Sequence, residues 1–260
     1  MGVLREPGAT TAWTTPNLTH SSTRVAQKVA VVAGLEAIPS IVASMRIEIF
    51  SDVICPWCFI GKRRFETAIM RLRDRGIDIE VDYSFKPFQL DPTAPTDGAT
   101  PVIEGYAKKF GGQARATEIL QHVTSVAAAE NIQFNMDIAL RANTFDAHRL
   151  LAYALVNYGN ASHVALKERL MDAYFTNGLN IADVDVLAGC ASTIGIDRDA
   201  CLKFLQSDEL AAQVRAEISS ASDLGVTAVP TFVINGQWSV PGAQDVEMFE
   251  RILERMHAQA

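Results

Sequence analysis

Two cysteines, Cys55 and Cys58, lie where a strand-like segment gives way to a helical one. Residues 47–54 are rich in isoleucine, valine and phenylalanine, a composition that favours a strand. From Phe59 to Leu72, apolar side chains recur at helical spacing, with basic side chains on the other face. The order strand, Cys-x-x-Cys, helix is the pattern of a thiol–disulfide redox site.

The spacing of the two cysteines suits this chemistry. Two intervening residues on a first helical turn allow the sulfur atoms to bond, and one of them must attack as a thiolate. Unpaired N–H groups and the helix dipole favour negative charge on Cys55. Pro56 fits the first helical position, where its missing N–H costs nothing. We therefore predict that Cys55 is the exposed attacking thiol and that Cys58, one turn deeper, resolves the mixed disulfide.

Two other interpretations of this pair are structural cysteines in the core and half of a zinc site. Zinc sites usually have a second pair at similar spacing, but Cys190 and Cys201 have ten residues between them. We predict no metal site. Cys190 and Cys201 are expected to be small buried apolar residues, with a regulatory second disulfide as the alternative.

Composition and charge narrow the class of protein. With 48% hydrophobic and 20% charged residues, the 260-residue chain is expected to form an ordinary globular protein of one or two domains. The net charge is −7 without a long basic run, which argues against nucleic acid as a partner. Four cysteines are too few for a disulfide scaffold and fit a reducing compartment, so we predict a cytoplasmic location.

Residues 1–44 differ from the rest of the chain. A segment rich in Thr, Ser, Pro and Asn is followed by an apolar run at residues 29–43, which Glu36 and Pro39 interrupt. This run is too short and too interrupted to span a membrane, and we predict no membrane partner. We interpret residues 1–44 as an N-terminal extension, disordered or weakly structured, with a targeting segment or a docked helix as alternatives.

The pattern after the first helix changes from strand to helix. Gly76 is expected to end the helix, and residues 77–85 alternate apolar and polar side chains as a second strand, parallel to the first. Residues 101–206 then show helical periodicity, with Asp183 and Asp197 as N-caps. His148 lies at the start of one of these helices. We expect it to be structural or solvated, with contact to the redox site as the alternative.

Strand patterns return near the C-terminus. Residues 231–234 and 237–240 are joined by Asn235-Gly236, a strong hairpin signal, and residues 244–257 form a last amphipathic helix. Pro230 directly precedes the first of these strands. It is either an ordinary strand-entry proline or a cis proline beside Cys55 that leaves a free backbone edge for an extended substrate.

Together, several of these segments resemble the DsbA family, and within it the FrnE-like branch. The matching segments are Ser51-Asp-Val-Ile-Cys-Pro-Trp-Cys-Phe-Ile-Gly-Lys-Arg-Arg-Phe65, Lys86-Pro-Phe-Gln-Leu90, Asn143-Thr-Phe-Asp-Ala-His-Arg-Leu150, residues 225–236 and Pro241-Gly-Ala-Gln244. The resemblance implies an α/β, thioredoxin-like fold interrupted by an all-helical insertion domain, with a cis Pro230 facing Cys55. We place the two halves of the thioredoxin-like domain at residues 45–98 and 207–260, and the insertion at residues 99–206.

The resemblance also implies a thiol–disulfide oxidoreductase acting on protein or small-thiol substrates. Trp57 stands where periplasmic DsbA proteins typically have histidine, so we expect a less extreme oxidant. No cofactor is expected. A low-molecular-weight thiol such as glutathione is a possible co-substrate. The sequence does not decide between a monomer and a homodimer. The expected substrate-binding residues are Pro56, Trp57, Val229 and Pro230.

Two other functions are alternatives to this one. A kappa-class glutathione transferase or 2-hydroxychromene-2-carboxylate isomerase would share the fold, but such enzymes typically have serine at the position of Cys55 and lack the second cysteine. A non-catalytic peptide-binding or chaperone module is the other alternative, and it predicts that a Cys55→Ser variant keeps its function.

Overall fold

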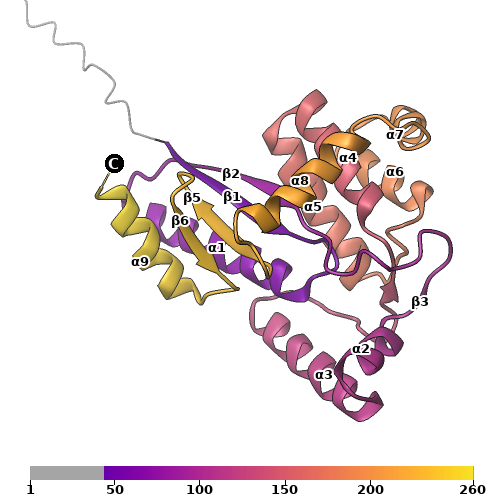
Figure 1. The fold of residues 1–260 in the computed structure, drawn as a ribbon. Helices are drawn as coiled ribbons and strands as arrows, with labels where there is room; N and C mark the ends of the chain where they lie inside the picture. Colours follow the sequence, from indigo (N-terminus) through magenta and orange to yellow (C-terminus); the bar gives the residue numbers. More distant parts are fainter. Residues whose placement is uncertain (1–43, 260) are drawn as a thin grey trace, which may run out of the picture. The chain divides into compact units, whose positions relative to one another are not determined.

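A four-stranded sheet in the order β2-β1-β5-β6 organises the fold (Figure 1). The computed structural model describes residues 44–259, so the predicted N-terminal extension lies outside the described residues except for Ser44. β1 runs parallel to β2, as predicted, whereas β5 is antiparallel to both β1 and β6. The strands are β1 (Met45–Ser51), β2 (Val81–Pro87), β5 (Thr231–Ile234) and β6 (Trp238–Pro241).

The predicted hairpin joins β5 to β6. Asn235 and Gly236 have φ angles of 51° and 68°, in the left-handed region that these two residue types adopt at little cost. The Asn235 side chain also accepts a hydrogen bond from the main-chain N–H of Arg46, which ties the turn to β1. The local sequence and the hydrogen bond to the neighbouring strand therefore both favour this turn.

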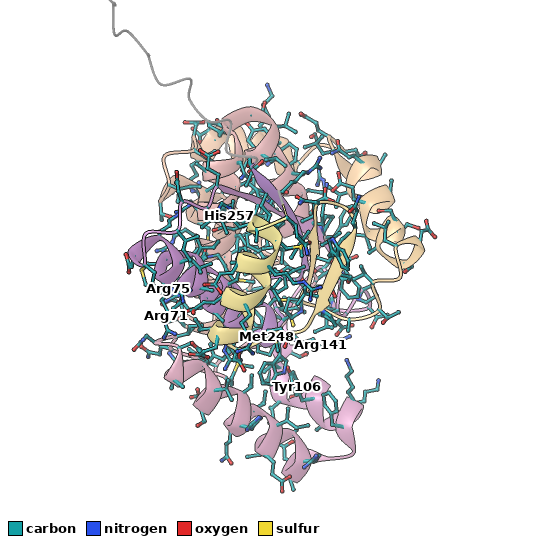
Figure 2. The ribbon with its side chains drawn as sticks, turned by 90° about the vertical axis from the view of Figure 1, so that its left-hand side faces the viewer. Arg71, Arg75, Tyr106, Arg141, Met248 and His257 are labelled. Carbon is teal, nitrogen blue, oxygen red and sulfur yellow. The ribbon has the colours of Figure 1, made fainter. Side chains whose placement is uncertain are left out.

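Two helices, α1 (Pro56–Asp74) and α9 (Val246–His257), cover one face of the sheet. Phe65 of α1 packs against Phe232 of β5 and Phe249 of α9, with ring centroids 5.3 and 5.6 Å away. At the outer edge of this contact, Arg71 and Arg75 of α1 lie beside α9 (Figure 2) and form ion pairs with its glutamates. The apolar contact supplies most of the stabilisation, because exposed ion pairs contribute little.

The opposite face of the sheet is covered by α8 (Ala211–Asp223), a helix that the local sequence pattern does not predict. Ala221 of α8 packs with Phe50 of β1 and Val226, and Val233 of β5 lies against the same cluster. Phe50 and Val233 alternate with the strand residues that face α1 and α9. β1 is buried on both faces only at its C-terminal end, because Arg46 and Glu48, which share the side of Phe50, are exposed and half-buried.

A helical region separates the two halves of the sheet, which confirms the predicted α/β fold with a helical insertion. Two short strands, β3 (Thr100–Pro101) and β4 (Leu140–Arg141), pair within it. No helix within residues 44–259 has the length and apolar character needed to cross a membrane. The remaining helices are α2 (Val102–Phe110), α3 (Gln113–Ala129), α4 (Phe145–Tyr158), α5 (Asn160–Phe175), α6 (Val184–Ser192) and α7 (Arg198–Leu205).

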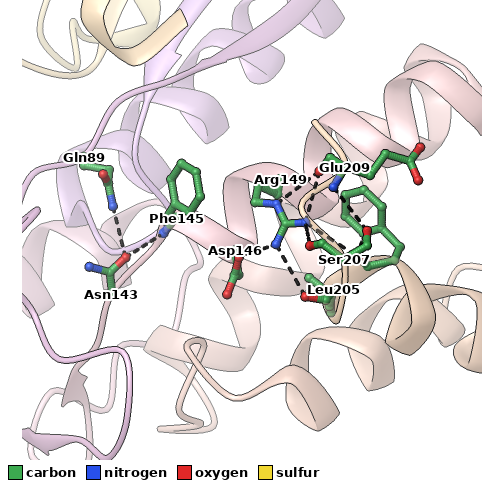
Figure 3. Close-up of polar contacts among 9 residues, drawn as sticks. Gln89, Asn143, Phe145, Asp146, Arg149, Leu205, Ser207 and Glu209 are labelled. Carbon is green, nitrogen blue, oxygen red and sulfur yellow. Dashed lines mark hydrogen bonds and ion pairs between the residues drawn. The ribbon is translucent and has the colours of Figure 1, made fainter. Parts of the chain in front are cut away.

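Two side chains near the start of α4 hold the connecting segments in place (Figure 3). Asn143 accepts hydrogen bonds from the Gln89 side chain and from the main-chain N–H of Phe145, so it joins the segment after β2 to α4. Arg149 is buried and pairs with Asp146. Its guanidinium also donates to the main-chain carbonyls of Leu205 at the end of α7 and of Ser207 and Glu209 between α7 and α8.

Candidate active site

The two predicted redox cysteines meet at the N-terminus of α1. Cys55 is the N-cap residue and Pro56 is the first helical residue, as predicted. The side chains of Cys55 and Cys58 lie 3.4 Å apart, and both are free thiols. Two sulfurs at this distance need only a small movement to form a disulfide, whose bond length is about 2.0 Å.

The prediction that Cys55 is exposed is wrong. The exposed fractions of Cys55 and Cys58 are 3% and 2%, so burial does not distinguish them. Cys55 belongs to a core cluster against which Tyr106 of α2 and Val229 pack. The helical insertion and the segment before β5 therefore cover a sulfur that its position at a helix terminus would otherwise leave open.

The peptide bond between Val229 and Pro230 is cis, which confirms the conformation implied by the family resemblance. The Cys55 thiol lies 3.6 Å from the Val229 carbonyl oxygen, its hydrogen-bond acceptor, so this segment directly adjoins the cysteine pair. Gly61 of α1 makes room for it. A Cβ atom at Gly61 would stand 3.1 Å from Cγ of Pro230 and 3.3 Å from Cβ of Ala243.

Trp57 is the part of the Cys-Pro-Trp-Cys motif that reaches solvent, with an exposed fraction of 37%. Its ring centroid lies 6.3 Å from that of His122 on α3. Tyr106 of α2 approaches from the same region, and burial together with the nearby Cys55 raises its pKa to about 12. Trp57 therefore lies where the motif meets the insertion.

The pKa order of the two thiols is the reverse of the predicted one. A hydrogen bond with Cys58 and burial raise the pKa of Cys55 well above its ordinary value. Burial alone would raise the pKa of Cys58 too, but the hydrogen bond from Cys55 and the charge of Lys167 lower it. No main-chain N–H of α1 donates a capping hydrogen bond to the Cys55 sulfur. The S–H of Cys55 instead donates to the Val229 carbonyl oxygen.

Asp52 is a buried carboxylate three residues before Cys55. Its Oδ1 accepts hydrogen bonds from the N–H of Val53 and from Nε2 of His148, and its Oδ2 accepts one from the N–H of Leu90. Nε2 of His148 also lies 3.0 Å from the Phe88 carbonyl oxygen, which can only accept, so this nitrogen carries the proton. His148 is therefore buried and structural, and it supports Asp52 beside the redox motif.

A buried lysine from the insertion completes the surroundings of the cysteine pair. Lys167 of α5 is fully buried, and its Nζ lies 3.4 Å from the carbonyl oxygen of Ser51. Burial lowers the pKa of Lys167 to about 8, against the opposing effect of nearby Cys58 and Asp52. The Lys167 ammonium group and the Asp52 carboxylate thus both lie buried beside the cysteine motif, out of contact with water.

The other two cysteines lie on α6 and α7, outside the redox motif. Cys190 and Cys201 are both buried, as predicted, and both are free. Burial raises the pKa of each thiol, so both favour the unreactive protonated form. Within the part of the chain that the structure describes, no three His, Cys, Asp or Glu side chains group as metal ligands would.

The structure adds three residues to the predicted site: Asp52, Gly61 and Lys167. Asp52 and Gly61 lie inside the segment that resembles the DsbA family, so their place beside the cysteine motif could have indicated a role in the site. No sequence signal places Lys167 at the site, because a lysine in an amphipathic helix ordinarily faces solvent.

A model of the DSBA-like thioredoxin domain family matches residues 46–254. The chain belongs to this family. Among solved structures, the probable DsbA oxidoreductase SCO1869 of Streptomyces coelicolor is 32% identical, with a TM-score of 0.74 over 83% of this chain and 91% of that one. The family and this neighbour make the chain a DsbA-like protein of the thiol oxidoreductase type.

Two other relatives extend the comparison. The uncharacterised Bacillus subtilis protein YwbO is 27% identical over 223 residues, which cover 81% of this chain and 96% of YwbO. The cytosolic disulfide reductase DsbM of Pseudomonas aeruginosa is 16% identical, with a TM-score of 0.58 over 83% of this chain and all of DsbM. At that identity, DsbM shows the shared DsbA-like fold alone.

Proposed function

We propose that this protein catalyses dithiol–disulfide exchange through Cys55 and Cys58. The observation that carries the proposal is the pair of free thiols 3.4 Å apart at a helix N-terminus, with Cys55 directly beside the Val229 carbonyl. Membership of the DSBA-like family supports it. Cysteines with a purely structural role would not need to lie this close together as free thiols. They would also not need a neighbouring segment with unpaired main-chain groups.

In the reducing direction, the sulfur of Cys55 attacks one sulfur of a substrate disulfide. A mixed disulfide forms between Cys55 and the substrate, and the second substrate sulfur leaves as a thiolate. Cys58 then attacks the Cys55 sulfur, which forms the Cys55–Cys58 disulfide and releases the first substrate sulfur. Two electrons pass from the enzyme dithiol to the substrate disulfide, and the reverse sequence oxidises a substrate dithiol.

We propose that the substrate binds along Val229 and Pro230. Among residues 44–259, the main-chain N–H of Val229 donates no hydrogen bond, and its carbonyl oxygen holds only the Cys55 thiol. An extended peptide or the amide groups of a small thiol such as glutathione can pair with these groups. Trp57, in the same motif as Cys55, offers an exposed ring, and Pro56 shapes the first turn of the helix.

We further assign the protein to the FrnE-like branch and to the cytoplasm. The Cys-Pro-Trp-Cys motif, with tryptophan at position 57, supports the first assignment. The second is supported by cysteine usage, since the four cysteines form no disulfide in the structure and no disulfide scaffold is present within residues 44–259. No organic cofactor takes part in this proposal.

The test is equilibration of the protein with a glutathione redox series, followed by quantification of the Cys55–Cys58 disulfide. We expect a reversible two-electron couple that Cys55→Ser abolishes and that Cys190→Ala, at a buried cysteine on α6, leaves intact. A potential near −120 to −180 mV would place the protein with oxidants and isomerases, and one near −270 mV with thioredoxin-like reductants. Absence of any reversible couple would refute the proposal and favour a binding module.

A further inference from the structure

His148 connects the helical insertion to the turn that carries Cys55. It lies near the start of α4, and its exposed fraction is 3%. Its Nε2–H group has two acceptors, Oδ1 of Asp52 at 3.1 Å and the carbonyl oxygen of Phe88 at 3.0 Å. The neutral ring with Nε2 protonated and the imidazolium both donate from Nε2, so this contact does not depend on the charge of the ring.

Asp52 transmits this contact to the cysteine turn. Its Oδ1 also accepts a hydrogen bond from the N–H of Val53, and its Oδ2 accepts one from the N–H of Leu90. Its carbonyl oxygen accepts from the N–H of Cys55 at 3.3 Å, which closes the turn of residues 52–55. The exposed fraction of Asp52 is 0%, so water does not compete for these bonds. The place of the Cys55 main chain therefore depends on where Asp52 is held.

The position of this turn matters because the two sulfurs are close but not bonded. Cys55 and Cys58 lie 3.4 Å apart as free thiols, whereas a disulfide bond is about 2.0 Å long. A turn held in one conformation keeps Cys55 beside Cys58 and reduces the entropy that closure of the disulfide costs. In a looser turn the same two thiols would meet at a lower effective concentration, and the disulfide would be less stable.

We propose that His148 is a positioning residue for dithiol–disulfide exchange, which fixes the turn of Cys55 through Asp52 and thereby favours the Cys55–Cys58 disulfide. The inference rests on the proposed function and deepens it, because it gives the helical insertion a part in setting the redox equilibrium. No electron or proton passes through His148 in this role. Its contribution is one hydrogen-bond donor at a fixed place.

The insertion should stay attached when His148 is replaced, because other contacts join the same segments. The Asn143 side chain accepts a hydrogen bond from the Gln89 side chain (Figure 3). It also donates to the carbonyl oxygen of Ala94, and the main-chain N–H of Asn143 donates to that of Pro95. These bonds connect the segment after β2 to the start of α4 without His148. We therefore expect a variant that lacks the Nε2–H donor to fold.

The test compares His148→Leu with His148→Gln in the glutathione redox series. Leucine removes the donor, whereas the side-chain amide of glutamine donates from about the same place as Nε2. We expect His148→Leu to lower the equilibrium constant for Cys55–Cys58 disulfide formation about tenfold, which makes the couple about 30 mV more oxidising. We expect His148→Gln to restore this constant to within about twofold of the wild-type value. A glutamine variant no better than the leucine variant would overturn the inference.

The matched control is His163→Leu. His163 is also buried, and its ring also bonds to main-chain groups of β2 and α4, at Phe85 and Leu151. Neither bond involves the turn of residues 52–55. We expect this variant to lose stability but to keep the wild-type redox equilibrium. Equal changes of the equilibrium in the two leucine variants would show a general loosening of the protein and would refute a specific role of His148.

A measurement on the wild-type protein applies if the His148→Leu variant fails to fold. A positioning contact must persist through the reaction, so the Nε2–H proton of His148, followed by NMR, should exchange slowly with solvent in both the dithiol and the disulfide form. Rapid exchange in either form would overturn the inference. A wild-type redox couple that His148→Leu leaves unchanged refutes the inference alone, whereas the absence of any couple in the wild type refutes the proposed function.

Discussion

Replacing Asp52 by asparagine should destabilise the protein, because both carboxylate oxygens accept main-chain hydrogen bonds. Oδ1 accepts from the N–H of Val53 at 2.8 Å, and Oδ2 accepts from the N–H of Leu90 at 2.7 Å. Asparagine keeps one acceptor oxygen and turns an NH₂ group toward the other N–H. Two donors then face each other in a place without water, and the charge assistance of the remaining bonds is lost.

An unmatched buried donor costs about 1–3 kcal/mol, and lost charge assistance adds to it, so we expect the free energy of unfolding to fall by about 3 kcal/mol. Urea unfolding followed by circular dichroism measures this. The matched control is Asp183→Asn. Asp183 is the exposed N-cap of α6, where asparagine caps as well as aspartate, and the change should be below about 0.5 kcal/mol. An Asp52→Asn variant as stable as this control would refute the hydrogen-bond reasoning.

Two further predictions concern α1 and α5. Gly61→Ala places a methyl group 3.1 Å from Cγ of Pro230, and we expect a loss of about 1–3 kcal/mol and slower disulfide exchange. Gly189→Ala, in a helix where a Cβ meets nothing within 4 Å, should instead stabilise slightly, and equal results would contradict the packing argument. His163 is neutral in the folded protein, with a pKa lowered to about 4 by burial, while the unfolded chain binds the proton near pH 6.5. Stability should therefore fall by about 3 kcal/mol as the pH drops from about 6.5 to about 4. Unfolding curves across this range, with His163→Gln for comparison, measure it, and an unchanged slope in the variant would exclude His163 as the cause.

Much of the fold follows from local patterns in the sequence. The strand, cysteine motif and helix lie where the periodicity places them, and Asp183 and Asp197 cap α6 and α7 through their own side chains. Asn235 and Gly236 form the predicted turn. These features depend on residues a few positions apart, and a single segment determines them. Helix α8 was not predicted, since its apolar face becomes evident only against β1 and β5.

The tertiary structure alone decides the surroundings of the cysteine pair. The sequence places Cys55 at a helix N-terminus, and this local effect favours a thiolate there. In the folded protein, a hydrogen bond with Cys58 and burial raise the pKa of Cys55 instead, and Val229 approaches Cys55 from 174 residues away. Burial and charge act through space. The sequence therefore determined where the two cysteines lie in the fold, and the packing of distant segments decided what surrounds them.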